Sequence, residues 1–214
     1  MCGIARCDVI PYTARMRSPM QDAVRADEEF QEKRRYTYAD YLDWEGPERY
    51  ELFDGEAFAM ASPSVVHQAL LMGLSLDFGN WLQGKSCRVF AAPLDVRLFP
   101  KEDKSDRTVV QPDLLVVCDK SKLDKDSVNG PPDLVIEIVS PSKTSSELFR
   151  KFNYYLKAKV REYWVVDPES KGVSVHVYES GRYISTTYND NDRIPVTVIE
   201  GLEISLEALW ARLP

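Results

Sequence analysis

The chain has 214 residues, of which 29% are charged and 44% are hydrophobic, and its formal net charge is −7. This length suits one ordinary folded domain, and no apolar stretch approaches the roughly 20 residues of a membrane-spanning helix, so we expect a soluble protein. The negative charge argues against a protein that coats nucleic acid through its overall charge, and a polyanionic partner would need a local basic patch.

Residues 1–35 show no convincing hydrophobic period, and we expect a loosely attached extension ahead of a single domain over 36–214. The opening Met1-Cys2-Gly3-Ile4 resembles the start of class II glutamine amidotransferases, whose N-terminal cysteine is the nucleophile. That resemblance covers four residues, with no further signature of the family downstream, and stands as a remote alternative.

The four cysteines show neither a C-x-x-C pair nor the spacing of a disulfide framework: Cys2, Cys7, Cys87 and Cys118. No apolar signal segment follows the N-terminus. We therefore expect reduced thiols in a cytoplasmic protein.

Clear local signals begin near Thr37, which with Asp40 can cap a short helix. Asp54-Gly55 predicts the turn of a hairpin between strands at 50–53 and 56–60. Ser64 then opens a long helix that ends at Gly84. Its inner stripe should contain His67, Leu70, Leu71, Leu74, Phe78, Trp81 and Leu82.

Two apolar strands in the middle of the chain each carry one acid. Strands at 88–91 and 94–99 and a charged loop precede the first, 111–117, which has Asp113 near its start. After a polar loop at 119–129 comes the second, 134–139, with Glu137 at its centre. Its apolar run predicts burial on both faces, where an unpaired charge costs several kcal/mol.

The two acids suggest a metal site. If the two strands pair, Asp113 and Glu137 can converge, and their mutual repulsion would be relieved by a divalent cation between them. Carboxylate oxygens suit Mg²⁺ or Mn²⁺, and such an ion can activate water for attack on a phosphodiester.

A basic helix is expected over 144–158, directly after the Glu137 strand. The segment from 143 to 161 has six basic residues against the single acid Glu147: Lys143, Arg150, Lys151, Lys157, Lys159 and Arg161. A charge run of this kind is often only a solvated face, and Glu147 and Lys151 could form an ordinary surface pair. Lys151 is nevertheless the candidate cation of the site, with Lys143 as its substitute.

The rest of the chain predicts strands at 163–168, a hairpin of 173–178 and 183–188, a short strand at 195–199 and a small helix at 206–213. This order of elements predicts one mixed α/β domain in which helices cover a central sheet.

Six ordered segments resemble the putative restriction endonuclease family, abundant in cyanobacteria, of the PD-(D/E)-x-K nuclease superfamily. They span about 36–211 and are Tyr50 to Glu56, Ser62 to Ser64 with His67, Pro93 to Leu98, Gln111 to Asp113, Val135 to Ser142 and Glu162 to Pro168. The resemblance implies a restriction-endonuclease-like core, with a central mixed β-sheet flanked by helices, and a nuclease that acts on DNA.

The resemblance also implies roles for individual residues. Asp113 and Glu137 would hold the metal, and the lysine usually found two residues after the second acid, here Val139, would be replaced by Lys151 from the next helix. The chain has Glu147 where the family usually has aspartate, and Lys159 where it usually has glycine.

Glu51 could be a further acid of the site or an exposed hairpin residue. His67 is more simply a hydrogen-bonded core histidine, and Asp95 and Arg97 a structural ion pair.

We therefore expect a magnesium-dependent endonuclease with duplex DNA as its partner, no membrane partner, and a homodimer if both strands are cut. The main alternative is a non-catalytic nucleic-acid-binding or interaction module on the same fold.

Overall fold

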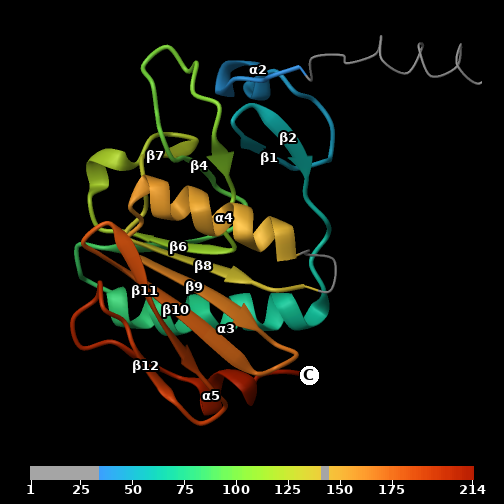
Figure 1. Ribbon diagram of the computed structural model, residues 1–214. Coiled ribbons are helices and arrows are strands. Elements are labelled where there is room, and N and C mark those ends of the chain that lie inside the picture. The colour runs from blue at the N-terminus through green and yellow to red at the C-terminus, as the bar shows by residue number, and fades with distance from the viewer. Residues whose placement is uncertain (1–33, 141–144) are drawn as a thin grey trace, which may run out of the picture. The chain divides into compact units, whose positions relative to one another are not determined.

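The computed structural model describes residues 34–140 and 145–214, and the statements below refer to these residues. A six-stranded mixed sheet with the strand order β11-β10-β9-β8-β6-β3 forms the centre (Figure 1). Its strands are β3 (Arg88–Ala91), β6 (Leu114–Val117), β8 (Leu134–Ile138), β9 (Glu162–Asp167), β10 (Gly172–Glu179) and β11 (Arg182–Tyr188). The expected pairing of the two acid-bearing strands is confirmed, because β6 and β8 are antiparallel neighbours with Leu114 opposite Ile136.

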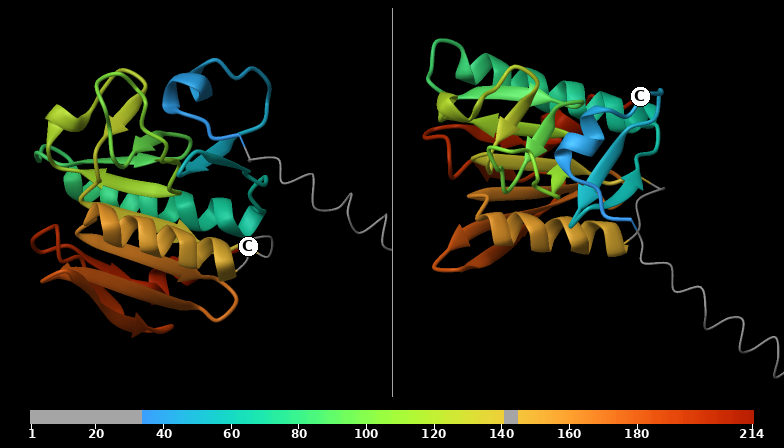
Figure 2. Two further views of the ribbon diagram at one scale, coloured as in Figure 1. Left: turned by 45° about the horizontal axis from the view of Figure 1, so that its top comes forward. Right: turned by 90° about the horizontal axis from the view of Figure 1, so that it is seen from above.

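Two long helices cover opposite faces of this sheet, as the view from above shows (Figure 2). Helix α3 (Val65–Leu82) packs on the face that presents Leu134, Ile136 and Ile138. Helix α4 (Ser145–Ala158) packs on the face that presents Val135, and side-chain alternation along β8 puts Glu137 on this same face. The expected helices over a central sheet are therefore present.

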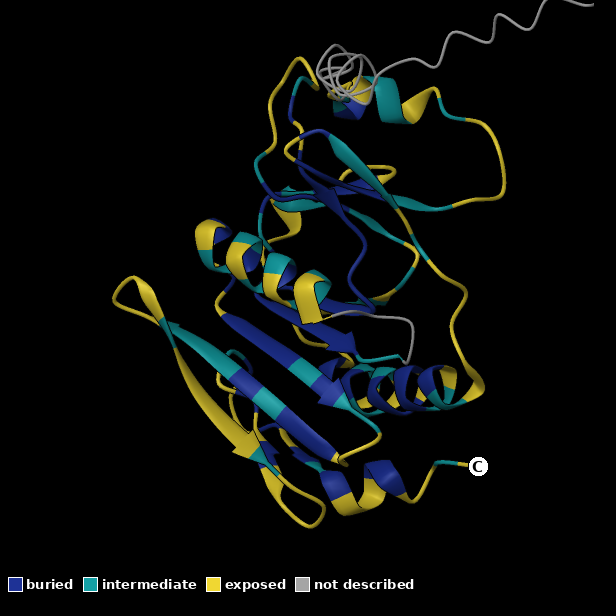
Figure 3. Ribbon diagram, turned by 45° about the vertical axis from the view of Figure 1, so that its right-hand side comes forward, coloured by how far each residue is buried: buried dark blue, intermediate teal, exposed yellow. Residues whose placement is uncertain are grey.

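Burial follows the prediction for the central strands. All five residues of β8 are buried, whereas the outermost strand β11 is largely exposed (Figure 3). One stripe residue of α3 departs from the expectation, because the Trp81 side chain is 39% exposed and the Lys85 ammonium lies 4.0 Å from its ring centroid.

A second sheet of five strands has the order β2-β1-β5-β4-β7. Its members are β1 (Tyr50–Phe53), β2 (Glu56–Ala59), β4 (Asp95–Arg97), β5 (Val109–Val110) and β7 (Ser127–Asn129). The hairpin of β1 and β2 is confirmed, and its turn residues Asp54 and Gly55 have φ of 49° and 84°, the left-handed region that this turn requires. Helix α2 (Tyr38–Leu42) begins with the expected cap, in which Thr37 and Asp40 bond reciprocally.

Three predicted elements differ from those observed. The strand expected at 111–117 begins only at Leu114, because Pro112 lacks an N–H donor, and Val109–Val110 instead joins the second sheet. The expected polar loop at 119–129 contains a 3₁₀ turn (Lys120–Lys122) and β7, which is parallel to β4.

The third difference lies near the C-terminus. The strand expected at 195–199 is replaced by β12 (Arg193–Pro195) and β13 (Glu203–Ser205), joined by a loop that Val196 and Ile199 anchor in the core. Helix α5 (Leu206–Trp210) follows and was expected.

The expectation of reduced thiols is wrong for two cysteines. Cys87 and Cys118 form a disulfide, because they directly flank the paired residues Arg88 and Val117 of β3 and β6 and so meet across the ladder. Cys2 and Cys7, with residues 1–33 of the predicted extension, lie outside the described residues. No helix in the described part of the chain is long and apolar enough to cross a membrane.

Candidate functional site

Lys151 is buried at the centre of a cluster of acids. Its ammonium lies 2.8 Å from Glu137 Oε1 and 2.9 Å from Glu51 Oε1, and the residue is only 6% exposed. Three elements supply these side chains: α4, β8 and β1. The alternative of a solvated Glu147–Lys151 surface pair is therefore wrong, as is the alternative of an exposed Glu51.

Tyr155 is a further contact of Glu137 and was not predicted as a site residue. It lies one turn after Lys151 on the same side of α4, and its hydroxyl donates a 2.8 Å hydrogen bond to Glu137 Oε1. The sequence places Tyr155 four residues from Lys151 and so on the same side of the helix. This spacing predicted an aromatic side chain facing the core but no contact with Glu137.

Asp113 approaches Glu137 through the backbone of β8. Its Oδ2 accepts a 2.7 Å hydrogen bond from the N–H of Ile138, the residue after Glu137. Its Oδ1 lies 3.1 Å from Nε2 of His67 on α3. His67 is thus the expected buried, hydrogen-bonded histidine, and its partner is an acid of the candidate site.

The electrostatics reflect one ammonium shared among several buried acids. Burial alone would lower the pKa of Lys151, but the carboxylates of Glu137, Glu51 and Asp113 outweigh it and raise this pKa above its ordinary value. Burial raises the pKa of Glu51, and Glu137 raises it further, while Lys151 opposes both. The lysine therefore stays charged, and Glu51 holds its proton more tightly than a free glutamate does.

A cavity of about 460 Å³ opens beside this cluster. Glu51, Asp113, His67 and Lys151 line it, together with apolar residues from the β1–β2 hairpin, α3 and α4. Glu137 has no exposed surface and lies behind Lys151. The cluster therefore presents two carboxylates and one ammonium to whatever enters the cavity.

The structure brings together all four residues that the sequence nominated: Glu51, Asp113, Glu137 and Lys151. The substitute Lys143 lies outside the described residues. The expected ion pair of Asp95 and Arg97 is wrong, because Arg97 pairs with Asp106, whereas Asp95 accepts hydrogen bonds from Tyr41 and Gln111. Residues two apart on a strand point to the same face, but here each of the two side chains bonds to a different neighbour.

The carboxylates of the site are compatible with a divalent cation that has few protein ligands. Among the described residues no group of three or more His, Cys, Asp or Glu side chains is arranged to hold a metal ion. Mg²⁺ commonly takes only one or two carboxylates and keeps water or substrate oxygens in its other positions. Asp113, which lines the cavity and bonds to the backbone next to Glu137, fits that requirement.

The mixed sheet, the two flanking helices and the buried acid–lysine cluster define the restriction-endonuclease-like class. The chain belongs to the family Uma2, described as putative restriction endonuclease, whose model matches residues 38–207. This membership places the protein among nuclease-like proteins.

Two individual relatives show how far the likeness extends. The chain is 27% identical over 178 residues to the uncharacterized protein slr1290 of Synechocystis sp., a match that covers 81% of this chain and 90% of the relative. The crystal structure of a putative nuclease of the DUF820 family from Anabaena variabilis has the same fold, with a TM-score of 0.68 and 19% identity. That match covers 84% of this chain and 99% of the other.

Proposed function

We propose that the protein is a metal-dependent endonuclease that hydrolyses DNA phosphodiester bonds. One observation carries the proposal: a buried lysine is held between two glutamates at the edge of a cavity that Asp113 also lines. Burying these charges is costly, and a core built only for stability would have no need of them. Perturbed ionisable groups beside a cavity are typical of catalytic sites.

Asp113 and Glu137 would hold the metal ion, Mg²⁺ or Mn²⁺. When bound, it would polarise the phosphate, lower the pKa of a water ligand and offset the charge that develops during hydrolysis.

The chain's own groups have separate roles in this proposal. The Lys151 ammonium offers a fixed positive charge to the phosphate that is attacked, already oriented by its bonds to Glu51 and Glu137. Glu51, held in turn by the N–H of Gln111 at 2.8 Å, fixes the position of Lys151 at the cavity wall. Tyr155 orients the Glu137 carboxylate.

A second candidate is a non-catalytic nucleic-acid-binding module. It is favoured by one observation, namely that Glu137 is fully buried and that Lys151 and Tyr155 both bond to its Oε1 atom. Such a module would bind DNA with an affinity that falls steeply with salt but would show no metal-dependent turnover. The amidotransferase alternative depends on Cys2, outside the described residues.

Duplex DNA, a homodimer and a cytoplasmic location also belong to the proposal. Cutting both strands of a duplex favours two-fold symmetry, because the strands run in opposite directions.

Plasmid cleavage by the purified full-length chain tests the proposal. With Mg²⁺ we expect nicked and linear products, none in EDTA, and a loss of about a hundredfold or more in Asp113→Asn and Glu137→Gln, because the metal supplies several kcal/mol of transition-state stabilisation. Glu203→Gln is the matched control, since Glu203 forms an exposed pair with Arg193. Absence of cleavage, or equal cleavage by Glu137→Gln, would refute the proposed hydrolysis.

A further inference from the structure

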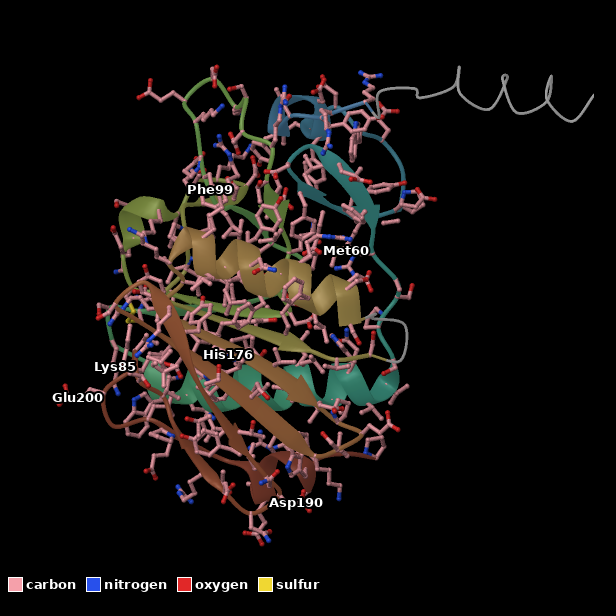
Figure 4. All side chains as sticks on the ribbon, viewed as in Figure 1. Met60, Lys85, Phe99, His176, Asp190 and Glu200 are labelled. Atoms are coloured by element: carbon pink, nitrogen blue, oxygen red, sulfur yellow. A yellow bond between two sulfur atoms is a disulfide. The ribbon has the colours of Figure 1, made fainter. Side chains whose placement is uncertain are left out.

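The cavity beside Lys151 combines charged and apolar lining. Three acids and three arginine or lysine side chains line it, namely Glu51, Asp113, Glu147, Arg49, Arg150 and Lys151. Several apolar side chains complete the wall, including Phe53, Phe58, Met60, Leu71 and Leu148. Met60 lies just past the end of β2 (Figure 4). Cavities of about 300–1,000 Å³ enclose one drug-sized ligand, and 460 Å³ lies within that range. A single nucleotide is a ligand of this size, whereas a base pair with both backbones is not.

An arginine lies over a phenylalanine ring in this lining. The guanidinium carbon of Arg150 lies 3.7 Å from the ring centroid of Phe58 and 5.4 Å from that of Phe53. Phe58 and Arg150 are half-buried, and both line the cavity. Aromatic rings and guanidinium planes are the surfaces on which proteins stack unpaired bases.

Two guanidinium groups add positive charge to a protein whose net charge is −7. Arg49 and Arg150 both line the cavity, and within residues 34–140 and 145–214 neither is paired with a carboxylate. Lys151, by contrast, is held by two glutamates. Arginine side chains in this situation are suited to binding phosphate.

We infer that this cavity receives one unpaired nucleotide of the DNA, with its base stacked on the Arg150 guanidinium, which lies over the Phe58 ring, and its phosphate bound by the nearby cations. The inference rests on the proposed function and narrows its substrate. The position that enters the site is single-stranded, lies in a bulge or flap, or is turned out of the duplex, as in enzymes that act on extruded bases.

Binding by the full-length chain in EDTA, where the proposed hydrolysis is blocked, tests the inference. Fluorescence anisotropy compares a labelled duplex closed at both ends by hairpins, the same duplex with one bulged nucleotide, and the corresponding single strand. We expect the bulged and single-stranded probes to bind about tenfold tighter than the closed duplex. Phe58→Ala and Arg150→Ala should each lower the affinity for the bulged probe by about five- to 150-fold.

Phe149→Ala is the matched control, because Phe149 lies on the same helix, is 69% exposed and does not line the cavity. Equal binding of the closed and bulged duplexes would overturn the inference, as would losses in Phe58→Ala and Arg150→Ala no larger than in Phe149→Ala. Thermal melting checks that each variant is folded, and if Phe58→Ala is not, Arg150→Ala decides.

The same probes separate this inference from the proposed hydrolysis. A chain that prefers the bulged probe but never cuts DNA in Mg²⁺ refutes the hydrolysis and supports the nucleotide site. A chain that cuts the closed duplex and binds all probes alike refutes the nucleotide site and supports the hydrolysis. Displacement of the bulged probe by an RNA strand but not by the DNA strand would overturn the assignment to DNA.

Discussion

The Lys151 ammonium lies 2.8 Å from Glu137 Oε1, although the two residues are 14 positions apart, one on helix α4 and the other on strand β8. In the nuclease superfamily that the sequence resembles, the lysine usually sits two residues after the second acid, which here is Val139. Helix α4 instead brings a lysine to the acid from outside the strand. In this chain the cation beside Glu137 therefore comes from the following helix and not from the strand itself.

Replacing this lysine should cost both stability and activity. Lys151→Met leaves Glu51 and Glu137 buried without their shared cation, and breaking a buried pair in this way costs about 3–5 kcal/mol. Urea unfolding followed by tryptophan fluorescence measures the free energy of unfolding, and plasmid cleavage measures activity. Lys157→Met is the control, because Lys157 is an exposed lysine on the same helix and should change stability by no more than about 0.5 kcal/mol.

A double substitution separates the two effects of that change. Lys151→Met with Glu137→Gln removes one buried charge together with its partner, so its cost should fall below the sum of the single costs by about 0.5–3 kcal/mol. Cleavage by the double variant should be no higher than cleavage by Glu137→Gln alone. Strictly additive costs would show that the two side chains do not interact as the structure describes.

Local signals were sufficient to predict much of the fold. The turn at Asp54-Gly55, the cap at Ser64 and the apolar run around Glu137 each depend on neighbours in the sequence, and each gave the observed element. The predicted site depended on pairing of the two acid-bearing strands, and β6 and β8 are indeed neighbours. Strands β5 and β7 of the second sheet were missed, since two or three residues carry no usable period.

The contacts within the site were beyond sequence reasoning. Glu51 and Lys151 are 100 positions apart in the chain, and their contact depends on how α4 packs on the sheet. A run of charged residues on an amphipathic helix predicts a solvent-exposed face. The sequence does not show that one of these residues, Lys151, has buried partners. The role of Tyr155 was hidden for the same reason, because its hydroxyl partner lies on β8.

Tyr155→Phe tests whether Glu137 must be held in position. The change removes the hydrogen bond to the Glu137 carboxylate but keeps the ring, whose centroid lies 4.9 Å from that of Tyr163. We expect a loss of about 1.5–3 kcal/mol in stability and a 10- to 100-fold rise in the Mg²⁺ concentration needed for half-maximal cleavage. Tyr183→Phe, which loses a 2.9 Å bond to the Val160 carbonyl, should cost stability while leaving the Mg²⁺ requirement unchanged. The same Mg²⁺ requirement in both variants would contradict a positioning role for Tyr155.

The pKa of Glu51 predicts a specific dependence of stability on pH. Burial and the nearby Glu137 raise this pKa above the ordinary 4.5, against the opposing effect of Lys151. The folded state then binds the proton more tightly than the unfolded state, so the free energy of unfolding should fall as the pH rises from 4.5 through the raised pKa. Glu51→Gln removes the titrating group and should therefore flatten this part of the curve of stability against pH. Urea midpoints measured at a series of pH values test this. Glu169→Gln, at an exposed position, should keep the wild-type slope, and an unchanged slope in Glu51→Gln would rule out this contribution.

Lys159 occupies a backbone position that favours glycine. Its φ is 60°, just after α4 ends at Ala158, and the family it resembles usually has glycine here. A side chain in this left-handed region costs about 1–2 kcal/mol, partly offset by the greater freedom of glycine in the unfolded chain. Lys159→Gly should therefore raise stability by up to about 1 kcal/mol, whereas Lys157→Gly, inside the helix, should lower it by about as much. Destabilisation by both changes in urea unfolding would show that Lys159 is not strained.

The disulfide should stabilise the fold without affecting the site. It links residues 31 positions apart, and closing a loop of this kind stabilises by about 2–4 kcal/mol. Cys118 follows the end of β6, while Asp113 precedes its start, so about 15 Å of strand separates the disulfide from the acid. Cys87→Ser should lower the urea midpoint of unfolding and make this midpoint insensitive to dithiothreitol, while plasmid cleavage stays unchanged. The control is the double variant Cys2→Ser with Cys7→Ser, whose midpoint should respond to dithiothreitol as that of the wild type does. Equal sensitivity of wild type and Cys87→Ser to dithiothreitol would show that this disulfide does not stabilise the protein.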